Sequence, residues 1–290
     1  MSAKTQYSVS DWLNLHQWTK EDVTDYCYAI RAAYQPNPES SRTDDTAKRV
    51  PFDLDHSLQN LVRPALNTLL GFADAPGYDI SSVKILKYSP SQLDLSFTEW
   101  CEKTDGPVIH IIWSGCVADL ICLAHEISHA VQVILSAHVF MVPVAREVCA
   151  FLGELALIKF AMGENDALYW QLCTVWRRQN ARYLGSDVAR LLDDLKIMSS
   201  PYVYRHNYPL ARVAAMSLFA GMNCGQLKGF FASGSAACDF LNLADVMKEL
   251  RRHDAMPVGV KKSKAMVGGV AFGEGHLRMA HNTFINSLEQ

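Results

Sequence analysis

The chain has 290 residues, of which 49% are hydrophobic and 20% are charged. These values are typical of a globular protein with a large buried core. The formal net charge is −3 and the basic residues are scattered, so a nucleic-acid partner is not expected. The first residues are polar, and no segment offers about 18 uninterrupted apolar residues, so neither a secretory signal nor a membrane span is expected.

Eight cysteines are spread along the chain without any Cys-x-x-Cys pair, and several lie in apolar runs with helical periodicity. This spacing indicates free thiols rather than a disulfide framework or a cysteine-based zinc site. Because free thiols are typical of reducing compartments, we expect a cytoplasmic protein. The sequence leaves the oligomeric state open.

The first hundred residues are predicted to combine helices with short strands. Residues 7–34 and 54–73 have helical periodicity, and Thr19 is the expected N-cap of a helix in the first range. Residues 83–88 and 93–97 alternate between apolar and polar side chains, as strands do.

A further strand is predicted at residues 106–115, where a β-branched run lies between two turns. It leads directly into an apolar helix at 117–137, and a second apolar helix carries residues 144–160. We expect this strand at the edge of a small sheet, lining a cleft where an extended substrate could pair with it. Later helices are expected at 163–197 and 210–222, and another one after a turn at Phe230. The predicted fold class is mainly α with a small β-sheet, α+β.

The pattern His-Glu-x-x-His occurs inside the first apolar helix, at residues 125–129. Residues four apart share a helix face, so His125 and His129 can bind the same metal ion. Glu126 is displaced around the axis, from where its carboxylate can reach a water molecule without being a ligand. A zinc hydrolase needs this combination of a Lewis acid and a general base. The alternative is a pair of core histidines, but burying these polar groups without partners would be costly.

The second apolar helix carries two acidic residues, Glu147 and Glu154, which lie seven residues apart and therefore on one face. Their neighbours are nearly all apolar, which argues against two solvated glutamates. We expect Glu147 to be the third metal ligand, and Glu154 to orient a ligand or to replace Glu147 in that role. One Zn²⁺ per chain is the expected cofactor, with manganese and cobalt as the alternatives.

Residues 199–209 are rich in groups that donate hydrogen bonds. Phenol and imidazolium donors can stabilise the oxyanion that forms when water attacks a carbonyl group. The candidates are Tyr204, His206 and Tyr208, and the sequence does not select one of them. A tyrosine-rich packing loop is the alternative interpretation.

The metzincin pattern is absent, because Gln132 and Leu135 stand where it requires Gly and His. A gluzincin, with a glutamate ligand on a following helix, is the remaining class. Within it, residues 106–129 resemble the strand, loop and active-site helix of the M3 peptidases, the oligoendopeptidase F and thimet oligopeptidase family. Residues 147–154, 201–206 and 230–235 resemble later segments of that family, in the same order.

The resemblance covers residues 106–250 and implies a zincin-like metallopeptidase domain acting on a peptide or protein substrate. It implies zinc bound by His125, His129 and Glu147, with Glu126 as general base. The expected division is an N-terminal region at 1–105, the catalytic core, and a tail at 251–290 of unknown role. Ser128 replaces the usual glycine, and the short front region predicts an open cleft. The alternative functions are an inactive module that binds peptides or proteins and a regulatory protease with a single protein target.

Overall fold

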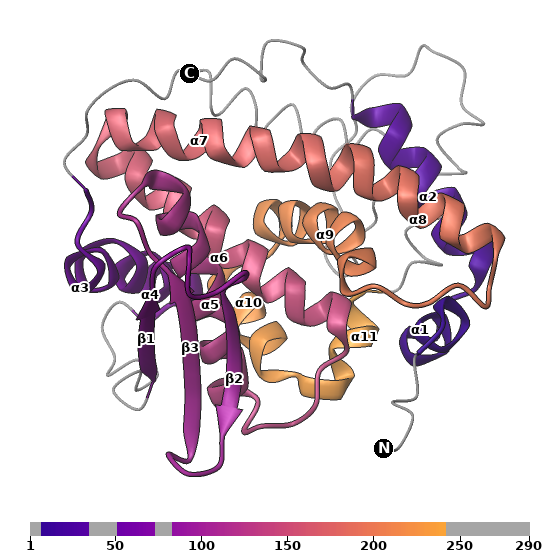
Figure 1. The fold of residues 1–290 in the computed structure, drawn as a ribbon, viewed down its shortest axis with the longest axis horizontal. Coiled ribbons are helices and arrows are strands. Elements are labelled where there is room, and N and C mark those ends of the chain that lie inside the picture. Colours follow the sequence, from indigo (N-terminus) through magenta and orange to yellow (C-terminus); the bar gives the residue numbers. More distant parts are fainter. Residues whose placement is uncertain (1–6, 35–50, 73–82, 242–290) are drawn as a thin grey trace.

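A computed structural model describes residues 7–34, 51–72 and 83–241 (Figure 1). In this part the chain is mainly helical with one three-stranded sheet, so the predicted α+β class is confirmed. The predicted tail at 251–290 lies outside the described residues.

The sheet has the strand order β1-β3-β2, with β1 at Lys84–Tyr88, β2 at Phe97–Cys101 and β3 at Gly106–Ile112. Strand β3 runs parallel to β1 and antiparallel to β2. The prediction that β3 lies at the edge is therefore wrong. Its β-branched side chains include the buried Ile109 and Ile111, and a strand with so apolar a sequence is typical of the middle of a sheet. The two edges are formed by β1 and the more polar β2.

Strand β2 also begins later than expected, at Phe97 rather than at residue 93. The connection at 102–105 places Cys101 opposite Gly106, and pairing extends back from this turn. The strand pairing stops short of Ser96. The hydroxyl of this serine accepts the hydrogen bond from the Ile112 N–H, so no backbone carbonyl does. The expected domain boundary after residue 105 thus falls inside a hairpin, and the three-part division stays a prediction.

Two long helices form the centre of the fold, α5 at Val117–Leu135 and α6 at Pro143–Glu164. The start of α5 is fixed by Asp119, whose carboxylate accepts hydrogen bonds from the backbone N–H groups of residues 114, 115 and 116. By length and composition alone α5 could cross a membrane, but 67% of its apolar window is buried inside this fold. Helix α5 is therefore built as a core helix.

Helices α5 and α6 approach most closely where Gly153 faces Ser128. A Cβ atom at position 153 would collide with the Ser128 hydroxyl and would lie 2.9 Å from the Ala124 carbonyl oxygen. The Ser128 hydroxyl donates to that same carbonyl, at 2.7 Å. A glycine on α6 thus makes room for the serine on α5, and this contact sets the spacing of the two helices.

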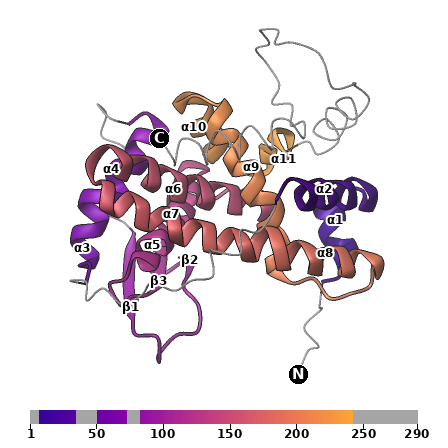
Figure 2. The same ribbon diagram turned by 90° about the horizontal axis from the view of Figure 1, so that it is seen from above.

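The N-terminal residues form two helices, α1 at Val9–His16 and α2 at Lys20–Ala33, separated by Gln17 in a left-handed conformation. Thr19 caps α2, as predicted. Figures 1 and 2 place α1, α2 and α8 at one end of the long axis, with the sheet and α3 at the opposite end.

The remaining helices largely follow the predicted ranges, except near Phe230, which lies buried in a helix instead of a turn. Its aromatic ring is buried in the core, and the helix that contains it, α10, extends to Ala232. These elements are α3 (Leu54–Ser57), η2 (Leu58–Val62), α4 (Arg63–Leu70), α7 (Asp166–Asn180), η4 (Ala181–Ser186), α8 (Asp187–Lys196), η5 (Tyr204–His206), α9 (Asn207–Gly221), α10 (Cys224–Ala232), η6 (Gly234–Ala236) and α11 (Ala237–Phe240).

Candidate metal centre

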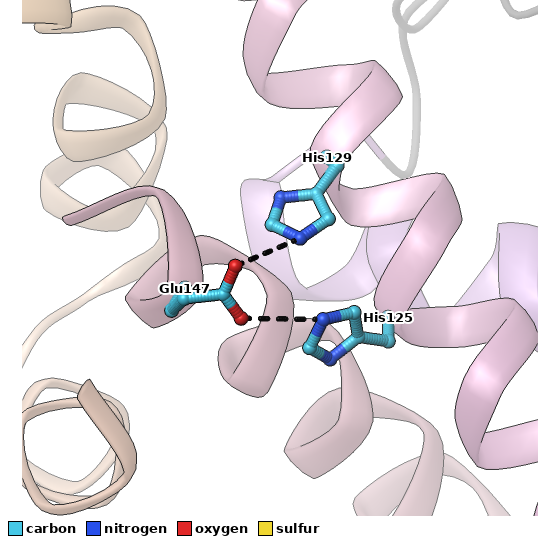
Figure 3. Close-up of side chains that lie close together, drawn as sticks. All are labelled: His125, His129 and Glu147. Carbon is cyan, nitrogen blue, oxygen red and sulfur yellow. Dashed lines mark ion pairs between the residues drawn. The ribbon is translucent and has the colours of Figure 1, made fainter. Parts of the chain in front are cut away.

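Two histidines on α5 and one glutamate on α6 converge at the centre of the molecule (Figure 3). The Nε2 atom of His125 lies 3.3 Å from Oε2 of Glu147, and the Nε2 atom of His129 lies 3.4 Å from Oε1. One donor atom from each residue lies within 4.8 Å of the others. The spacing predicted from the sequence thus brings these three side chains together.

The geometry of this cluster suits a small divalent cation. The two histidine nitrogens face different oxygens of one carboxylate, and imidazole nitrogen and carboxylate oxygen are donors that zinc takes. The Oε2 atom of Glu147 is buried without a hydrogen bond from any described residue. Because an unsatisfied buried carboxylate oxygen is costly, a cation would remove that cost. The cluster of His125, His129 and Glu147 could therefore hold a metal ion.

Glu154 lies behind His125 and outside the cluster. Its Oε1 atom is 2.7 Å from Nδ1 of His125, so Nδ1 donates its proton to Glu154 and Nε2 is the ring atom that faces Glu147. This arrangement orients a histidine for metal binding. Of the two predicted roles, the structure favours that of an orienting residue for Glu154.

Arg212 on α9 completes the support of His125, and sequence reasoning missed it. Its Nη1 atom donates to Oε2 of Glu154 at 2.7 Å, and its Nε atom donates to Asn180 at 2.8 Å. The guanidinium lies 3.0 Å from the centre of the Trp176 ring and is fully buried. Burial lowers the pKa of Arg212, and the charge of Glu154 opposes that shift. The sequence feature that could have indicated this role is the single arginine within the otherwise apolar helix predicted at 210–222.

The carboxylates and histidines shift one another's pKa values. Burial disfavours the charged form of Glu147, but the charge of His129 and the close contacts with both histidine rings outweigh it and hold the pKa well below its usual range. Burial likewise disfavours protonated His125, yet bonds to Glu147 and Glu154 raise its pKa well above the ordinary value. Without a metal ion, the cluster therefore binds a proton in the place of the metal. Proton binding and metal binding compete.

Glu126 lies buried on α5, and its side chain is held by the edge strand. The Thr98 hydroxyl on β2 donates to Oε2 of Glu126 at 2.7 Å. This contact was missed, because the sequence predicted a strand at residues 93–97, which ends before Thr98. It fixes one carboxylate oxygen of the candidate general base, and among the described residues the other oxygen has no hydrogen bond.

Two of the three candidate oxyanion donors lie near Glu147. The Tyr204 hydroxyl donates to Oε1 of Glu147 at 2.7 Å. The Tyr208 ring lies 6.1 Å from the Tyr204 ring, and burial, with smaller contributions from the charges of Glu147 and Glu126, raises the pKa of Tyr208. Within the described residues, the Tyr208 hydroxyl makes no hydrogen bond. It is therefore available to a ligand.

The structure does not bring His206, the third candidate, to the metal cluster. Its Nε2 atom lies 2.9 Å from Asp194, and its Nδ1 atom accepts the Val203 N–H at 3.3 Å. The ring is buried and packs against Trp12 and Tyr202. Tyr204 on η5 and Tyr208 on α9 lie with their rings 6.1 Å apart, whereas the His206 ring packs on Trp12 and Tyr202.

Comparisons with known proteins do not identify a family for this chain. No protein-family profile and no curated protein matches the chain. One solved structure, described as a "putative peptidase from Chlamydophila abortus", matches over 78% of this chain at 13% identity with a TM-score of 0.48. The chain spans 49% of that protein's length. This likeness is too distant to support an argument about function, and the M3 resemblance stays a prediction.

Proposed function

We propose that the protein is a zinc metallopeptidase of the gluzincin type that hydrolyses peptide bonds in peptides or proteins. The observation that carries this proposal is the convergence of two histidine Nε2 atoms and the Glu147 carboxylate, with Glu126 on the same helix as the histidines. Two histidines and a glutamate are a donor set of catalytic zinc sites. Zinc bound by His125, His129 and Glu147 would supply a Lewis acid that lowers the pKa of water to about 7.

Glu126 is the proposed general base. Its carboxylate accepts a proton from the attacking water and then delivers that proton to the leaving amine. The hydrogen bond from Thr98 holds Oε2, so Oε1 is the oxygen that takes the proton. A purely structural metal site has no need of such a carboxylate.

Tyr208 is the proposed donor to the developing oxyanion. Its raised pKa keeps the phenol protonated at neutral pH, so it remains a hydrogen-bond donor. Tyr204 already donates to Glu147, and His206 lies elsewhere. The free edge of β2, beside Glu126, is the surface on which an extended substrate backbone would pair by strand addition.

The test measures metal content and peptide-library cleavage on the same purified samples of wild type and Glu126→Gln. Glu164→Gln, at the exposed end of α6, is the matched control. The expected result is roughly one zinc per chain in all three proteins, with cleavage lost only in Glu126→Gln. Zinc without cleavage in any of them would favour the binding module or the single-target protease. No zinc in wild type would refute the proposal.

A further inference from the structure

A cavity of about 710 Å³ lies next to the candidate general base. It is enclosed by β2, the end of α5, the 136–142 connection and the start of α6. Thr98 connects the cavity to the candidate general base. It lines the cavity, and its hydroxyl donates a hydrogen bond to Glu126. A side chain adjacent to the hydrolysed bond of a substrate would reach this space.

Arg146 supplies the positive charge of the cavity. Its Nη2 atom lies 3.5 Å from the Thr98 carbonyl oxygen, and its Nε atom is buried without a hydrogen bond from any described residue. In the part of the chain that the structure describes, no carboxylate forms an ion pair with this guanidinium. Since a guanidinium has five donors in a planar fork that matches a carboxylate, Arg146 has unused capacity for such a ligand.

The other walls favour an extended side chain that ends in a charge. Trp100 and Met141 line the cavity with apolar surface, which an aliphatic stem of the bound group can cover while its charge reaches Arg146. Glu99 and Asp105 also line it, but both are exposed, and Glu99 lies 3.1 Å from His110. Solvent and salt screen these two negative charges more than the partly buried arginine.

We propose that this cavity binds a carboxylate of the substrate and that Arg146 selects peptides with an acidic group beside the cleaved bond. The inference rests on the proposed peptidase function. The carboxylate belongs either to an Asp or Glu side chain or to the C-terminus of a short peptide. Arg146 directly precedes the candidate ligand Glu147, so it fixes this charge at a constant position relative to the metal cluster.

The binding test uses the Glu126→Gln variant, which retains uncleaved peptide, and fluorescein-labelled decapeptides of alanine, serine and leucine. One position at a time carries Glu, Gln or Lys, and each peptide has either a free or an amidated C-terminus. At the best position, Glu should bind about 10- to 100-fold more tightly than Gln. A preference only for the free C-terminus would assign the cavity to the terminal carboxylate.

Variants at Arg146 test the assignment directly. Adding Arg146→Gln should reduce the Glu-to-Gln affinity ratio to about 3 or less, and Arg146→Glu should invert the preference towards Lys. Inversion requires a folded protein, so it cannot arise from misfolding. Asp105→Asn removes a negative charge from the same cavity and should strengthen the preference for Glu.

The outcomes separate this inference from the proposed function. If wild type cleaves peptides but binds Glu and Gln forms equally, the role of Arg146 is overturned while the peptidase stands. If Glu peptides bind through Arg146 and wild type cleaves none of them, the cavity is supported and the peptidase fails. A preference that survives Arg146→Gln and Arg146→Glu would place the carboxylate elsewhere.

Discussion

Arg212 and Glu154 form an ion pair of 2.7 Å inside the helical core, where their side chains are 0% and 2% exposed. Taking two charges out of water costs several kcal/mol per ion, so the pair is no sign of added stability. The second oxygen of Glu154 contacts Nδ1 of His125 at 2.7 Å. The pair therefore serves to hold His125 in the orientation and tautomer that a metal requires.

Glu154→Gln should weaken zinc binding by about 10- to 100-fold, because His125 loses its charged orienting partner. Arg212 would also become an uncompensated buried charge, which costs about 3–5 kcal/mol of stability. Competition with a chelator measures the affinity, and urea unfolding of the metal-free protein measures the stability. The double variant Glu154→Gln/Arg212→Met should recover stability but keep the weak zinc affinity. Recovery of both would contradict the orienting role.

Tyr208→Phe should lower kcat by about 100- to 1,000-fold, because it removes a donor from the developing oxyanion. Tyr204→Phe should lower it less, since the Tyr204 hydroxyl is engaged with Glu147. Both variants should retain zinc, and rates on a single library peptide compare them. A larger loss for Tyr204→Phe would exchange the roles of the two tyrosines.

The parts of the site that the sequence predicted lie within single helices. The spacing of His125 and His129 and the shared face of Glu147 and Glu154 follow from helical periodicity, so local pattern was sufficient. The helical ranges and the presence of a small sheet were also predictable from local sequence patterns. Only the packing of α6 against α5, however, could place Glu147 opposite the histidines.

The parts that the sequence did not predict depend on contacts between distant segments. Thr98 on β2 reaches Glu126 on α5 across 28 residues of sequence, and the predicted strand ended before Thr98. Arg212 is 58 residues from Glu154 and sits in a helix whose register is set by tertiary packing. His206 lies in the same polar segment as Tyr204 and Tyr208. The direction of its side chain, however, follows from η5, the short helical turn that precedes α9.

Gly153→Ala should destabilise the protein by about 1–3 kcal/mol, although alanine is the better helix former. The added Cβ would collide with the Ser128 hydroxyl and force α5 and α6 apart. Gly163→Ala on the same helix is the matched control, since a Cβ there meets nothing within 4 Å and should stabilise by up to about 1 kcal/mol. Urea unfolding compares the two. Equal stability would show that the helix spacing is not set at this contact.

His16 makes the fold sensitive to acid at a site far from the metal cluster in sequence. It is 2% exposed, its Nδ1 atom lies 2.7 Å from the Trp12 carbonyl oxygen, and its Nε2 atom accepts the Val144 N–H at 3.2 Å. Burial lowers its pKa to about 4 from the ordinary value of 6.5. The neutral ring therefore ties α1 to the first turn of α6.

The free energy of unfolding should fall as the pH drops from about 6.5 towards 4, because the unfolded chain takes up a proton on His16 in this range and the folded chain does not. At about 1.4 kcal/mol per pH unit, the loss approaches 3 kcal/mol. Urea unfolding of metal-free wild type and His16→Gln at pH 7.5 and 4.5 measures it, since other titrating groups cancel in the difference. His16→Gln should be less stable at pH 7.5 yet lose less on acidification. An identical pH dependence in the two proteins would show that His16 binds its proton equally well in the folded and the unfolded chain.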